Sequence, residues 1–260
     1  MAYYDLGAYT RRITTTSPDA QLWFDRGLNW LFGYNHEESI ACFNRALEQD
    51  PACAMAHWGV AYAAGPNYNL PWHLYDPAGK AKALATAHDA MQLALAHAGS
   101  ATPLEQALIQ ALPTRYPQRE PIEDQSAWDT AFADAMRAVF KANRDDLDVR
   151  CVFAESIMNL TPWQMWDLET GGAAPGAGTA EAVEVLESGF RDIAASWDHP
   201  GLLHLYVHLM EMSPFPQRAL RAGDRLRNLV PDAGHLIHMP THIDVLSGIT
   251  RTSSSTIARR

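Results

Sequence analysis

Residues 20–51, AQLWFDRGLNWLFGYNHEESIACFNRALEQDP, determine the predicted fold class. Large apolar residues recur every three or four positions around Trp23 and Trp30, and again in the second half of the stretch, as in two amphipathic helices. Residues 33–36 interrupt this pattern, and Pro51 ends it because proline cannot continue a helix. The stretch therefore predicts a hairpin of two helices.

The order of residues in this hairpin resembles the tetratricopeptide repeat, a family of helical hairpins with a period of about 34 residues. The matching positions are Trp23, Gly27, Trp30, Phe43, Ala46 and Pro51. Gly27 is the small residue that allows close helix approach, and Ala61 follows it by one period, so the register continues into the next helix. The resemblance implies an all-α fold, a tetratricopeptide-like array of helical hairpins, or α-solenoid.

The rest of the chain continues as helices with two interruptions. Further helices are predicted at 78–97, 103–112, 126–142, 147–160, 180–195, 200–212, 216–229 and 235–246. We expect a single helical-repeat domain over 1–260. Its parts are an N-terminal extension (1–19), a first repeat block (20–160) with a loop insertion at 65–77, a Trp- and Gly-rich loop (161–179), a His-rich second block (180–246) and a polar tail (247–260).

The end of this array lacks a partner helix. The predicted helix 235–246 would be the first half of a hairpin, yet residues 247–260 are polar and have no amphipathic pattern. An uncapped repeat exposes apolar surface. We therefore expect either a truncated product or an oligomer contact through this uncapped repeat.

Charge and composition exclude several classes of function. The formal net charge of −10 would repel nucleic acid. No run of 18 apolar residues is present, and residues 1–16 lack the apolar core of a signal peptide. No phosphate-binding loop, dinucleotide fingerprint or serine nucleophile turn occurs in the sequence. We expect a cytoplasmic protein without nucleic-acid or membrane partners.

Histidines are concentrated near the end of the chain, where six of the eleven lie between positions 199 and 242. His204 and His208 are four residues apart, as are His238 and His242, so each pair shares one face of a helix. The two pairs are also 34 residues apart, which is the repeat period. This spacing predicts that they lie side by side in consecutive hairpins.

The repeat register extends this set. With Pro51 and Pro231 as equivalent repeat ends, His235 joins the second histidine pair and Glu211 joins the first, and the resemblance implies that all six side chains face the concave groove. The predicted metal ligands are His204, His208, Glu211, His235, His238 and His242. Glu155 occupies the position that matches His208, so it is predicted to be a ligand or a general base. Pro240 would disrupt a helix interior but is tolerated near the first turn, so the pairing of His238 with His242 holds if the last helix starts late.

Imidazole and carboxylate donors suit a divalent transition metal, although they do not distinguish Zn, Fe, Cu, Ni and Mn. One reading is a metal-dependent enzyme with oxidative or hydrolytic chemistry on a small molecule. The alternative is a non-catalytic scaffold that binds a peptide or a partner protein in its groove, since histidines on helices are more often structural. The motifs HPGLLHLYVH and PDAGHLIHMPTH resemble a His-rich subgroup of repeat proteins, from which no reaction carries over.

Aromatic loop residues allow two interpretations. Trp163, Met165 and Trp166 could line the groove beside the metal or, more often for such residues, seal the core. Asn67, Tyr68 and Asn69, in the first inserted loop, allow the same two readings. His36 lies in a hairpin turn and is expected to face solvent, whereas His199 precedes a proline and is expected to begin its helix.

Overall fold

The computed structural model describes residues 3–249, which contain eleven α-helices and no β-strand. The α-helices are α1 (Pro18–Phe32), α2 (His36–Gln49), α3 (Ala54–Ala64), α4 (Pro77–His97), α5 (Pro103–Arg115), α6 (Ser126–Ala142), α7 (Leu147–Met158), α8 (Thr179–Asp192), α9 (Pro200–Glu211), α10 (Leu220–Leu226) and α11 (Gly234–Leu246). Short 3-10 helices are η1 (Trp72–Leu74), η2 (Ala98–Ser100), η3 (Ala194–Asp198) and η4 (Pro216–Ala219). The predicted all-α class is confirmed. No described helix is long and apolar enough to cross a bilayer.

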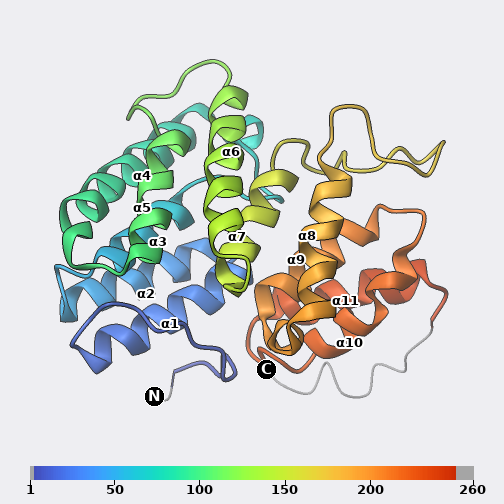
Figure 1. Cartoon of the computed structure of the whole chain (residues 1–260), viewed down its shortest axis with the longest axis horizontal. Coiled ribbons are helices and arrows are strands. Elements are labelled where there is room, and N and C mark those ends of the chain that lie inside the picture. The colour runs from blue at the N-terminus through green and yellow to red at the C-terminus, as the bar shows by residue number, and fades with distance from the viewer. Residues whose placement is uncertain (1–2, 250–260) are drawn as a thin grey trace.

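Helices that follow one another in the chain pack against one another (Figure 1). The helices α1–α6 lie on one side of the view and α8–α11 on the other, with α7 between them. Helix α9 contacts α1, α7 and α11, so it joins the two ends of the sequence. The predicted helix at 216–229 is instead divided into η4 and α10.

A phenylalanine between two glycines fixes the distance between the first three helices. Phe43 of α2 is fully buried, and a Cβ atom added at Gly27 of α1 or Gly59 of α3 would lie 2.7 Å from its ring. Real Cβ atoms do not approach other atoms so closely. Gly27 therefore allows close helix approach, as the sequence predicted.

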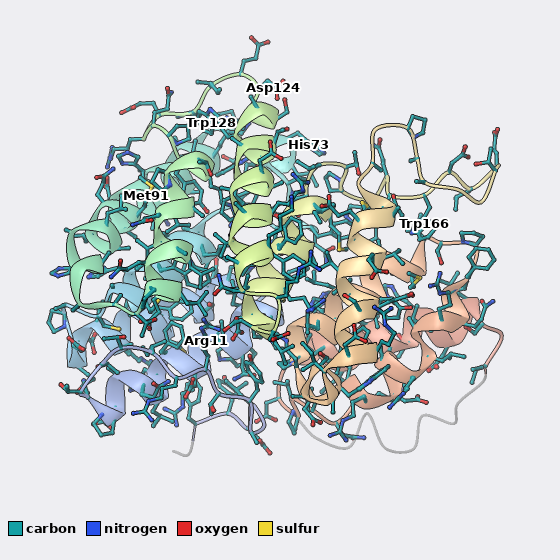
Figure 2. The ribbon with its side chains drawn as sticks, in the orientation of Figure 1. Arg11, His73, Met91, Asp124, Trp128 and Trp166 are labelled. Atoms are coloured by element: carbon teal, nitrogen blue, oxygen red, sulfur yellow. The ribbon has the colours of Figure 1, made fainter. Side chains whose placement is uncertain are left out.

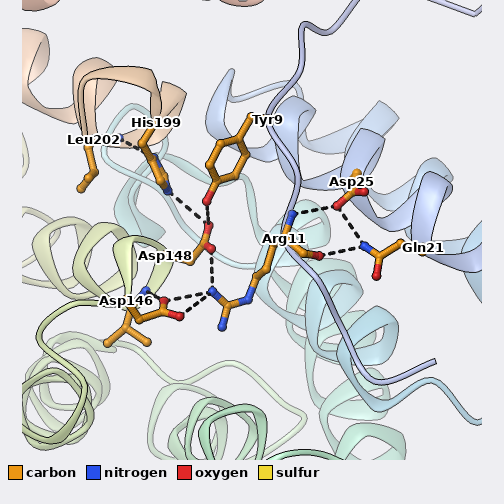
Figure 3. Close-up of polar contacts among 9 residues, drawn as sticks. Tyr9, Arg11, Gln21, Asp25, Asp146, Asp148, His199 and Leu202 are labelled. Carbon is orange, nitrogen blue, oxygen red and sulfur yellow. Dashed lines mark hydrogen bonds and ion pairs between the residues drawn. The ribbon is translucent and has the colours of Figure 1, made fainter. Parts of the chain in front are cut away.

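The segment before α1 is tied to α7 and α9 by a buried carboxylate (Figure 3). Asp148, at the start of α7, accepts hydrogen bonds from the Tyr9 hydroxyl at 2.9 Å and from the Arg11 guanidinium at 2.5 Å. His199 Nε2 lies 3.2 Å from the same carboxylate, and its Nδ1 accepts from Leu202 N. His199 thus caps α9, as predicted, and the network holds α7 against α9.

The last helix has a proline in its interior. Helix α11 begins at Gly234, within one residue of the predicted start, so the late start that would place Pro240 in the first turn does not occur. Proline removes one helical hydrogen bond. Pro240 instead packs closely on Gly223 of α10, where an added Cβ would lie 3.3 Å from the proline Cβ. Most of the predicted tail, residues 250–260, lies outside the described residues.

Candidate metal centre

Three histidines, two from α9 and one from α11, lie close together. One ring nitrogen from each of His204, His208 and His235 lies within 4.8 Å of the others. The ring centroids are 4.6 to 5.7 Å apart. His204 and His208 are buried, while His235 is partly buried. The helical spacing of four residues places the first two on one face, and the packing of α11 on α9 supplies the third.

Hydrogen bonds behind two of these rings determine which nitrogen faces the centre. His204 Nδ1 lies 2.7 Å from the carbonyl oxygen of Phe32, at the end of α1. Because a carbonyl only accepts, Nδ1 carries the proton and Nε2 keeps its lone pair in the neutral ring. His208 Nδ1 donates in the same way to the Glu211 carboxylate at 2.7 Å. Carbonyls and carboxylates in this position typically orient metal-binding histidines.

The Nε2 atoms of all three histidines are buried and have no hydrogen-bond partner among residues 3–249. Burial, followed by the neighbouring histidines, lowers the pKa of His204 well below its usual value. The same causes lower the pKa of His235 to about 4. These two rings are therefore neutral at neutral pH, as metal coordination requires.

The spacing of the nitrogens implies an adjustment on metal binding. Two nitrogens bound tetrahedrally at about 2.0 to 2.1 Å from one ion lie about 3.4 Å apart. The nitrogens here lie up to 4.8 Å apart, so the widest separation must shorten by up to about 1.4 Å. His235 is partly exposed and near the beginning of α11, so its ring has room to move.

Tyr34 completes the cluster from the turn between α1 and α2, and sequence reasoning missed it. Its ring centroid lies 4.6 Å from that of His204 and 5.7 Å from those of both His208 and His235. Its φ of 55° is in the left-handed region, which a bulky residue rarely adopts. Strained residues of this kind concentrate at functional sites. No local signal in the sequence marks Tyr34, because its neighbours come from α9 and α11.

Glu155 lies near this cluster without belonging to the three-histidine group. Burial raises the pKa of this carboxyl, and a hydrogen bond donated by the Tyr62 hydroxyl opposes that rise. Burial is the main cause of the raised pKa of Tyr34, and the charge of Glu155 is the second cause. These two side chains are therefore close together. A small cavity of about 20 Å³, lined by His204, Tyr34 and Glu155, has room for one water molecule.

The other predicted ligands lie behind the three-histidine group. Glu211 accepts from His208 Nδ1 through one carboxylate oxygen and from His242 Nδ1 through the other, at 2.6 Å. These hydrogen bonds lower the pKa of Glu211, although burial opposes them. His238 Nε2 lies 2.9 Å from His242 Nε2. The structure thus brings three of the six residues together and connects His242 and His238 to them through Glu211.

Both inserted loops reach His208. Tyr68, from the loop between α3 and α4, has its ring centroid 5.4 Å from that of His208, and Trp163, from the loop between α7 and α8, lies edge-on at 5.7 Å. Trp163 also has a positive φ of 62°. Met165 is fully buried, and Trp166 donates its indole N–H to the carbonyl of Leu209 in α9 (Figure 2). Trp163 therefore lines the site, while its two neighbours seal the core.

An open groove of about 1100 Å³ adjoins the cluster. Tyr34 and His235 line it together with Asn67 and Leu70 of the first inserted loop. His36 lines it as well, and its Nδ1 lies 2.7 Å from the Ala63 carbonyl. Burial lowers the pKa of His36 to about 4, and the residue is partly buried rather than fully exposed as expected for a turn.

No protein-family model matches the chain, and neither a curated protein nor a solved structure matches it. What the site does must therefore follow from its own residues.

Proposed function

We propose that His204, His208 and His235 bind a divalent transition metal and that the resulting centre acts on a small molecule held in the adjoining groove. The observation that carries this proposal is the set of three buried Nε2 atoms without hydrogen-bond partners in the described part of the chain. Leaving them unpaired costs free energy that an ion would recover. Three imidazoles leave coordination positions for water or substrate, and they suit Zn, Fe, Cu, Ni or Mn.

The surrounding side chains suit chemistry at such a centre. A bound metal would polarise a substrate oxygen or activate a water molecule. Glu155 has a raised pKa and lies beside Tyr34, so it can hold or release a proton next to the cluster. Tyr68 and Trp163 shield His208 from solvent. This set of residues would support oxidative or hydrolytic reactions.

We also propose that the helices form a tetratricopeptide-like array. The consecutive packing of α1, α2 and α3 around Phe43 supports this framework. The two loops that interrupt the helical pattern, at residues 65–76 and 159–178, both reach His208. Interruptions of a repeat that converge on one point favour a functional site there over a plain scaffold.

Elemental analysis of protein purified without an affinity tag tests the metal proposal. We expect one equivalent of transition metal to occupy this centre after reconstitution, and the variants His204→Ala and His235→Ala to bind one equivalent less than the wild type. His73→Ala is the matched control, because His73 is exposed (Figure 2) and does not belong to the three-histidine group. Circular dichroism would establish that each variant is folded.

Metal content that is negligible in the wild type after reconstitution with each of the five ions would refute the proposal. The groove would then be better explained as a peptide-binding surface. Equal metal content in the wild type and in folded His235→Ala protein would also contradict the ligand assignment.

A further inference from the structure

A second pair of histidines lies one turn apart on α11, at the surface. His238 is exposed and His242 is partly buried, and neither belongs to the buried three-histidine group. We propose that His238 and His242 form a second metal site, suited to Cu²⁺ or Ni²⁺, and that Glu211 links this surface site to the buried centre. The surface site stands on its own contacts and does not require the buried centre to hold an ion.

The distance between the two nitrogens favours a particular coordination geometry. His238 Nε2 and His242 Nε2 are 2.9 Å apart. Two nitrogens at this separation, each about 2.05 Å from one ion, subtend an angle of about 90°. That is the angle between adjacent ligands in square-planar and octahedral complexes, which Cu²⁺ and Ni²⁺ prefer. Tetrahedral Zn²⁺ would need a separation of about 3.4 Å.

The tautomers are compatible with this role. His242 Nδ1 donates to the Glu211 carboxylate, so the neutral ring keeps its lone pair on Nε2. In the hydrogen bond between the two rings, His238 Nε2 therefore carries the proton and His242 Nε2 accepts it. Metal binding requires His238 to carry its proton on Nδ1 instead. Since His238 is exposed, water can accept a hydrogen bond from that nitrogen.

Glu211 distinguishes this pair from an ordinary surface pair. The carboxylate is buried, with a relative exposure of 6%, and accepts one hydrogen bond from His208 and another from His242. One carboxylate oxygen therefore orients His208 of the buried centre, and the other orients His242 of the surface site. Loss of such an outer partner typically lowers metal affinity by about 10- to 100-fold.

Titration with Cu²⁺ alone, followed by calorimetry and electron paramagnetic resonance, tests the second site. The background is His235→Ala protein, so that a failure of the buried centre does not affect the result. We expect one Cu²⁺ with two nitrogen ligands, a loss of affinity of at least about 10-fold in His238→Ala and in His242→Ala, and no change in the control His73→Ala. Affinity that persists in both single variants would show an adventitious ion only and overturn the proposal.

The link through Glu211 is tested by Glu211→Gln in the same background. Glutamine keeps the shape of the side chain but removes its charge and one of its two acceptor oxygens, so both histidines lose the carboxylate that orients them. We expect the affinity of the surface site for Cu²⁺ to fall by about 10-fold. Unchanged affinity, in protein that remains folded, would overturn the link while leaving the surface site itself intact.

Discussion

Replacing Asp148 by asparagine removes the charge at the centre of the network that holds the N-terminal segment, α7 and α9 together (Figure 3). Although burial opposes it, the hydrogen bond from His199 and the charge of Arg11 lower the pKa of this carboxyl from 3.8 to about 2. The folded pKa lies below the unfolded value, so ionisation stabilises the fold above about pH 4, and this contribution is lost as the pH falls towards 2.

The magnitude follows from the difference between the two pKa values. A pKa lowered from 3.8 to about 2 corresponds to roughly 2 kcal/mol of stability at pH 7 and roughly 1 kcal/mol at pH 3. Because asparagine resembles the protonated carboxyl, we expect Asp148→Asn to lower the free energy of unfolding by these amounts. Urea denaturation at pH 7 and pH 3 measures both. Equal destabilisation at the two pH values, or less than about 0.5 kcal/mol at pH 7, would refute this reasoning.

Two further predictions concern packing and metal binding. Gly27→Ala should lower the free energy of unfolding by about 1 to 3 kcal/mol, because the new methyl group meets the Phe43 ring. Gly99→Ala, where an added Cβ meets nothing within 4 Å, is the control, and a similar loss there would contradict the packing argument. Zn²⁺ at about 100 times its dissociation constant should stabilise the wild type by about 2.7 kcal/mol and raise Tm by roughly 5 to 10 °C. A chelator should reverse this shift, and the same shift in His235→Ala would argue against the buried centre.

The helices could be predicted because their signals are local. Apolar spacing, prolines and capping residues lie within a few positions of each helix end, as at Pro51 and His199. The proximity of His204 and His208 was predictable for the same reason, since four residues make about one turn. Pro240 shows the limit of such rules, because it lies in the interior of a helix, where local rules disfavour proline, and packs on Gly223 of another helix.

The sequence by itself determined the helical class, the histidine pairs and their repeat spacing. Only the tertiary structure decided that His235, rather than His238 or His242, joins the buried pair, and that Tyr34 lies among them. The physical reason is that periodicity specifies which residues share a face of one helix, whereas the depth of each side chain depends on how neighbouring helices pack. Tyr34 reaches α9 because α1 and α9 pack against each other although most of the sequence lies between them. No local pattern encodes such a contact.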